Sequence, residues 1–198
     1  MSYEDKILNF LTQSENLPIA FQITEYVQKL KETNHQQFWP MLSIAMIEKL
    51  KSSEHGENWI YVPLTQEKWN EEYVGCGIQP IDGLSTDQPV IQIAFMQATP
   101  KNDLRLFMGV VCLPKIPKDL NRENLNTLVE ELIRLGMKSP NYRWFGYHYL
   151  HYHLREESFI IKLHKEPQVL MDESSAIYWD FFLKIHPYVQ AVHESLSR

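Results

Sequence analysis

The feature that most constrains the fold is a pair of apolar segments separated by a short polar turn. Residues 90–98 and 104–113 are rich in Val, Ile, Phe and Leu, and the residues between them, Thr-Pro-Lys-Asn-Asp, have the length and composition of a hairpin loop. The second segment is apolar on both of its alternating faces, which is typical of a strand that is covered on both sides. The sequence therefore predicts an antiparallel hairpin at the centre of a sheet.

The pattern before this hairpin has the period of a helix. In the first 52 residues apolar side chains recur at spacings of three and four, for example at Ile19, Ile23, Tyr26 and Leu30. The spacing predicts three helices, the second beginning near Pro18 and the third ending in the polar run before residue 57.

The segments after residue 56 predict a mixture of strands and helices. Further short strands are expected over residues 59–62, 73–78, 142–150 and 159–164. One helix should begin after Asn121 and end at Gly136, and the last should begin near Asp172 and be kinked or split by Pro187.

The order of these elements predicts an α+β fold. It would have N-terminal helices, a largely antiparallel sheet with one packed helix, and a C-terminal amphipathic helix. We expect a single domain over residues 1–198, with a helical N-terminal part (1–56) and an α+β part (57–198).

Charge, cysteine content and hydropathy favour a cytoplasmic protein without membrane contact. The chain has a formal net charge of −6 and two cysteines, Cys76 and Cys112, which are too far apart to form a CxxC motif. The polar N-terminus lacks the basic and apolar regions of a signal peptide, and no apolar run approaches the ~20 residues that cross a bilayer. Both thiols are expected to be reduced and buried.

The sequence lacks the glycine-dependent motifs that bind nucleotides, and the positions at which it departs from them can be named. No glycine is followed by lysine, and Gly75-Cys76-Gly77 begins a GxGxxG motif in which Pro80 stands at the third glycine. The GxSxG and HExxH motifs do not occur either. A non-enzymatic role without a cofactor is therefore favoured.

The aromatic residues of the chain are most concentrated in one segment, residues 142–152. Alternation along a strand would bury some of these rings and display others, and displayed aromatic and Arg side chains are typical of protein-binding hot spots and of surfaces that stack nucleic-acid bases. Ordinary core packing of the rings is the alternative. The candidate partner-binding residues are Tyr142, Arg143, Trp144, Tyr147, Tyr149, Tyr152 and Arg155.

Three histidines in the same segment support an alternative interpretation, in which the segment binds a metal ion. His151 and His153 would share one face of a strand and could chelate one ion, and His148 would join them only in a helix. The enzymatic alternative is a metal-dependent hydrolase that uses these three histidines, with or without Asp82. The structural alternative is that the three histidines only pack against their neighbours.

From Trp59 to residue 196 the order of features resembles the C-terminal portion of some bacterial nucleases of the PD-(D/E)XK superfamily. The shared features are tryptophans at Trp59 and Trp69, the strands Val-Ile-Gln-Ile-Ala-Phe and Leu-Arg-Leu-Phe-Met-Gly-Val, a capped helix, the segment Trp-Phe-Gly-Tyr and a closing helix. The nuclease centre does not carry over, because residues 92–94 read Gln-Ile-Ala where the superfamily has (D/E)-x-K. The resemblance thus implies an accessory part without nuclease activity.

Charge is unevenly distributed along the chain, which bears on the class of partner. Residues 101–165 carry 11 Lys and Arg against 7 Asp and Glu, whereas residues 1–100 carry 6 against 13. The first hypothesis is a bacterial protein that binds a protein partner, such as an immunity protein that inhibits a basic nuclease toxin, or an accessory protein of phage defence. A nucleic-acid-binding protein using Arg143, Trp144, Arg155 and the basic segment is a further alternative.

Overall fold

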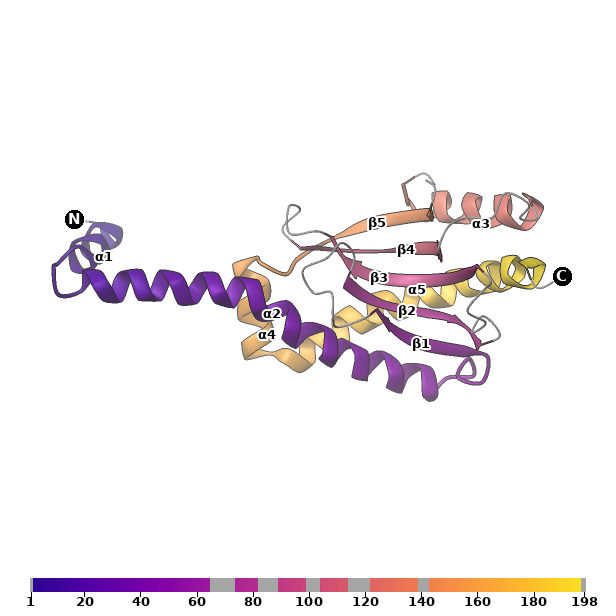
Figure 1. Cartoon of the computed structure of the whole chain (residues 1–198), viewed down its shortest axis with the longest axis horizontal. Helices are drawn as coiled ribbons and strands as arrows, with labels where there is room; N and C mark the ends of the chain where they lie inside the picture. Colours follow the sequence, from indigo (N-terminus) through magenta and orange to yellow (C-terminus); the bar gives the residue numbers. More distant parts are fainter. Residues whose placement is uncertain are drawn as a thin grey trace.

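The central feature of the computed structural model is a five-stranded antiparallel sheet in which each strand pairs with its neighbours in sequence (Figure 1). The strands are β1 (Trp59–Leu64), β2 (Val74–Pro80), β3 (Val90–Gln97), β4 (Arg105–Leu113) and β5 (Trp144–His153). The structure describes residues 2–64, 74–81, 89–98, 104–113, 122–138 and 143–196. The predicted pairing of the two apolar segments is confirmed as β3 and β4, with Val90 opposite Leu113.

Helices cover one face of this sheet. The described helices are α1 (Tyr3–Leu11), α2 (Leu17–Lys51), α3 (Arg122–Arg134), α4 (Glu157–Lys165) and α5 (Pro167–Leu196). Helix α5 lies against β3, the C-terminal half of α2 lies against β1, and α3 packs between β5 and α5. The predicted α+β fold is thereby confirmed. Within the described residues, no helix is long and apolar enough to cross a membrane.

Several predicted elements are wrong. The strand expected over residues 159–164 is helix α4, because Phe159, Ile160 and Leu163 lie on one helical face and are buried. The second and third helices expected in the N-terminal part form one helix, α2, which continues through Pro40.

The last helix also differs from its prediction. Helix α5 begins at Pro167 rather than near Asp172, and it is a single helix that continues through Pro187. Proline removes one backbone hydrogen bond from a helix. Here Ile185 and Val189 are fully buried on either side of Pro187, so core packing on both sides of the proline keeps the helix from splitting.

The main core lies between the sheet and the helices. Tyr178 of α5 stacks on Phe95 of β3 with 5.3 Å between ring centroids, and its hydroxyl donates a hydrogen bond to the carbonyl of Ile93. Trp39 of α2 donates from Nε1 to Oε1 of Gln97 over 2.7 Å. These two contacts satisfy buried polar groups while they fix both long helices against β3.

Both cysteines are buried and free, as the sequence predicts. Burial raises the pKa of the Cys76 thiol to about 12 and that of Cys112 to about 11. Thiols with such values are protonated near neutral pH and are poor nucleophiles.

The N-terminal half of α2 extends away from the sheet and carries α1 at its tip (Figure 1). We refer to residues 2–33 as the arm. No side chain of α1 is buried, and the first buried residue of α2 is Asn34. The arm therefore contributes nothing to the main core.

Strands β4 and β5 approach closely at Gly109, which makes this glycine a test of the strand pairing. A Cβ atom there would lie 2.3 Å from the carbonyl oxygen of Gly146 and 2.9 Å from Cα of Tyr147. Because both atoms belong to the backbone, we expect Gly109→Ala to lower the free energy of unfolding by about 1–3 kcal/mol. Urea denaturation measures the change, with Thr127→Ala on the exposed face of α3 as control. Equal midpoints for Gly109→Ala and wild type would contradict this pairing.

Candidate functional site

Four aromatic rings gather on the outer face of β4 and β5, the face opposite the helices. Phe107 lies 5.3 Å from Trp144 and 5.5 Å from Tyr149, and Tyr149 lies 5.8 Å from Tyr147, measured between ring centroids. We call these four residues the aromatic platform. They belong to a second apolar cluster, separate from the main core. Phe107 and Trp144 are buried, whereas Tyr147 and Tyr149 are half-buried and display part of their rings.

A β-bulge places these rings on one face of the sheet. The register between β4 and β5 shifts between residues 110 and 111, where the extra residue of β5 is Phe145. Phe145 turns into the main core and is only 1% exposed. Because a bulge reverses the alternation of side chains, Trp144 and Tyr147 share the outer face although they are three residues apart. Tyr149 follows Tyr147 on that face by ordinary alternation.

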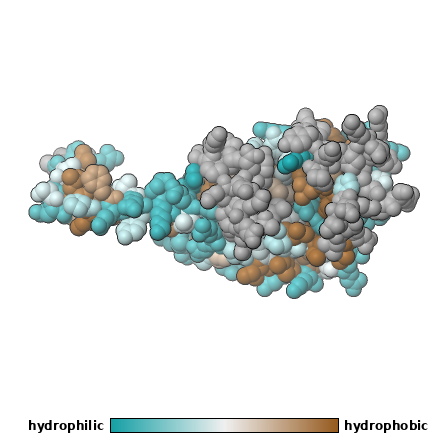
Figure 2. Space-filling model, viewed as in Figure 1, coloured by the Kyte–Doolittle hydropathy of each residue, from teal (hydrophilic) through white to brown (hydrophobic). Residues whose placement is uncertain are grey.

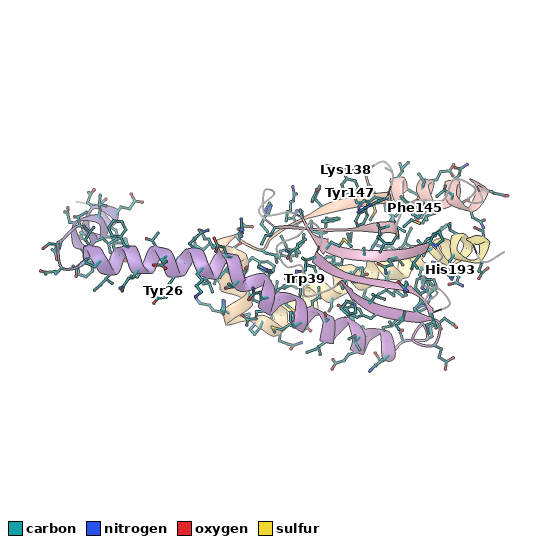
Figure 3. The ribbon with its side chains drawn as sticks, viewed as in Figure 1. Tyr26, Trp39, Lys138, Phe145, Tyr147 and His193 are labelled. Atoms are coloured by element: carbon teal, nitrogen blue, oxygen red, sulfur yellow. The ribbon has the colours of Figure 1, made fainter. Side chains whose placement is uncertain are left out.

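Two cations lie over the displayed tyrosines. Nζ of Lys138 is 5.7 Å from the ring centroid of Tyr147 and 5.1 Å from that of Tyr149, and Lys138 and Tyr147 lie together beside β5 in Figure 3. Cζ of Arg105 is 5.3 Å from the centroid of Tyr149. The platform thus presents aromatic surface and positive charge together.

The backbone holds both cations in place. Gly136 has a φ of +78°, a conformation that glycine adopts readily, and it turns the chain after α3. The amide of Lys138 then donates to the carbonyl of Tyr147 over 2.8 Å. Arg105 donates from Nε to the carbonyl of Leu150 over 2.8 Å. The Arg105 guanidinium is therefore held directly by the backbone of β5, and Lys138 is held beside Tyr147 through its own amide.

The structure brings together only part of the predicted binding set. Trp144, Tyr147 and Tyr149 belong to the platform, and Arg143 is exposed next to Trp144 at the start of β5. Tyr142 lies outside the described residues. The platform residues from β4 and the cation from the segment after α3 are not among the residues predicted from the sequence.

Tyr152 and Arg155 lie apart from the platform. Tyr152 packs against Phe159 of α4, and its hydroxyl donates to Glu173 over 3.3 Å. Burial, followed by the negative charge of Glu173, raises the pKa of Tyr152. Arg155 lines a cavity between the arm and the end of β5, together with Lys31 of α2. These two residues are therefore not part of one surface with the platform.

The predicted histidine cluster is not assembled as a metal site. His151 and His153 line the cavity near Arg155, which has a volume of about 650 Å³, whereas His148 lies on β5 opposite Met108. Among the described residues, no three His, Cys, Asp or Glu side chains are grouped so as to hold a metal ion. Asp82 lies outside the described residues.

A pair of histidines forms part of a second cavity of about 570 Å³, where the segment after α2 meets α5. The ring centroids of His55 and His186 are 4.3 Å apart. Nδ1 of His186 lies 3.3 Å and 3.1 Å from the carbonyl oxygens of Phe182 and Leu183, so this nitrogen carries the proton. Burial, followed by the nearby His55, lowers the pKa of His186.

The lowered pKa of His186 predicts that the fold is less stable in acid. A lowered pKa means that the folded state binds protons less readily than the unfolded state, whose histidines have an ordinary value of 6.5. Burial, followed by Arg155, lowers the pKa of His35 in the same direction. The free energy of unfolding should therefore fall as the pH is lowered from about 7.5 to about 5.5.

Urea titrations at several pH values measure this dependence. We expect a shallower dependence for His186→Gln than for wild type, and an unchanged one for Leu183→Ala, which removes an exposed side chain without a titratable group from the same helix. Identical slopes for wild type and His186→Gln would contradict the role assigned to His186.

No protein-family model, curated protein or solved structure matches this chain. The resemblance to the PD-(D/E)XK superfamily stays a prediction from the sequence.

Proposed function

We propose that this chain is a non-enzymatic cytoplasmic protein that binds an acidic segment of a partner protein on the aromatic platform. The observation that carries the proposal is the pair of half-buried tyrosines, Tyr147 and Tyr149, held under the cations of Lys138 and Arg105. Tyrosine and arginine are enriched among the residues that dominate binding energy in protein interfaces. A carboxylate of the partner would meet positive charge at the same place where an apolar side chain would meet the rings.

The charge balance favours a protein partner over a nucleic acid. The described cations at the platform are Arg105, Lys138 and the adjacent Arg143, and the whole chain is acidic with a net charge of −6. Affinity for nucleic acid depends chiefly on how many phosphates the protein neutralises. A short acidic peptide segment needs far fewer cations.

The biological role that we propose is that of an immunity protein or an accessory protein of phage defence. A basic nuclease toxin would not suit the platform, because the platform itself is positively charged. Such a toxin would suit the acidic N-terminal 100 residues, which carry 6 Lys and Arg against 13 Asp and Glu. The platform would then bind an acidic region of the same or another partner.

Affinity capture with the purified chain tests the proposal. Wild type, used as bait in a lysate of cells that carry the gene, should retain a stoichiometric partner, and the double variant Tyr147→Ala, Tyr149→Ala should lose it. The control is Ile161→Ala, which alters an exposed side chain of α4. Equal recovery by wild type and the double variant, or recovery of nucleic acid that is released by salt, would overturn the proposal.

A further inference from the structure

The arm exposes an unusual amount of apolar surface for a lone helical extension. Eleven of its large hydrophobic side chains are exposed. Figure 2 shows hydrophobic residues gathered at the tip of the arm. A soluble protein rarely leaves so large a patch uncovered.

The apolar residues of α2 within the arm have the spacing of a coiled-coil seam. Ile19, Ile23, Tyr26 and Leu30 follow one another at intervals of four, three and four. They are 54, 52, 69 and 38% exposed, and Tyr26 projects from the helix in Figure 3. We refer to these four residues as the seam. In a helix this spacing places all four on one side, where they would pack against a second helix.

We propose that the seam pairs with the seam of a second copy of the chain, with the two helices antiparallel. The spacing of four, three and four reads the same in both directions, so a two-fold axis between residues 24 and 25 maps the seam onto itself. Ile19 then meets Leu30 of the second copy, and Ile23 meets its Tyr26. Such an interface uses the same surface on both chains, as most homodimers do.

The residues beside the seam are compatible with this pairing. In antiparallel helices Ala20 lies beside Val27 of the second copy, and Gln22 lies beside its Lys29, so no like charges face each other. The arm carries 3 Lys against 5 Asp and Glu, which gives it no strong charge that would select a different, highly charged partner.

The area of the arm is also sufficient for a dimer. The four seam side chains and the adjacent Val27 offer on the order of 500 Å² per copy. Two copies together reach the ~1,000 Å² in total that is expected of a specific interface. The inference rests on the arm alone and is independent of the aromatic platform.

Sedimentation equilibrium of the full chain tests the oligomeric state. Wild type should have twice the chain mass of 23.5 kDa, and the double variant Ile23→Glu, Leu30→Glu should have the mass of one chain. The control is Ile44→Glu, since Ile44 is 61% exposed on the half of α2 that lies against the sheet, and it should remain a dimer. Circular dichroism confirms that each variant is folded. A monomeric wild type would overturn the proposal, and so would a monomer whose arm binds another protein. A double variant that remains a dimer would overturn it as well.

Cross-linking tests the antiparallel orientation, because both native cysteines are buried. With a short bismaleimide, Tyr26→Cys should cross-link efficiently, since the two copies of residue 26 would be offset by only about 4.5 Å along the helices. Ile19→Cys should not, because its two copies would be offset by about 16 Å. Equal cross-linking of both variants would indicate parallel helices and overturn the proposed pairing.

Discussion

Phe182→Ala is expected to lower the free energy of unfolding by about 3–5 kcal/mol, as large-to-small substitutions of buried aromatic residues do. Phe182 is fully buried in α5. Its ring stacks on Trp179 at 4.9 Å and on His186 at 5.2 Å, and it makes a T-shaped contact with Trp59 at 5.2 Å between centroids. Removing the ring would leave a cavity where α5, β1 and the segment after α2 meet.

Urea denaturation of Phe182→Ala and Leu183→Ala gives a matched comparison. Leu183 is the next residue of the same helix but is 43% exposed, so its loss should cost much less. Both substitutions replace a large apolar side chain with the same methyl group in α5. Similar destabilisation by the two variants would contradict the assignment of Phe182 to the core.

The sequence predicted the sheet better than the helices, for a physical reason. The hairpin of β3 and β4 is encoded locally, by two apolar segments on either side of a turn. In contrast, Phe159, Ile160 and Leu163 fit either a short strand or one helical face, and the burial of all three side chains in the folded chain selects the helix. Pro40 and Pro187 likewise do not mark helix ends, because packing against the sheet keeps α2 and α5 continuous.

Only half of the candidate site could be predicted, since the other half is created by pairing across the sheet. Trp144, Tyr147 and Tyr149 are recognisable as an aromatic segment, but the bulge at Phe145 that places them on one face leaves no signal in the sequence. Arg105 and Phe107 join them from β4 only through the register of the two strands.

Lys138 could have been suspected from the sequence. Glycine at position 136 ends α3, and a residue two positions later is well placed to return to the sheet. Which strand it reaches depends on the tertiary fold. The separation of Tyr152 from the platform has the same origin, because β5 changes register again before its end.

Tyr149→Ala is expected to weaken binding of the partner about 30-fold or more, which corresponds to a loss of about 2 kcal/mol, typical of a hot-spot residue. Tyr149 contacts the rings of Phe107 and Tyr147 and lies beneath both Lys138 and Arg105. Its removal takes away aromatic surface and the ring contacts of both cations with Tyr149 at once. Tyr152→Phe is the matched control, since Tyr152 lies in the same strand but packs on α4.

Titration calorimetry of the captured partner into wild type, Tyr149→Ala and Tyr152→Phe tests the proposed role of the aromatic platform most directly. If the platform is the binding site, wild type and Tyr152→Phe should bind with equal affinity, and Tyr149→Ala should bind at least about 30-fold more weakly. Equal affinities for wild type and Tyr149→Ala would contradict the proposed site.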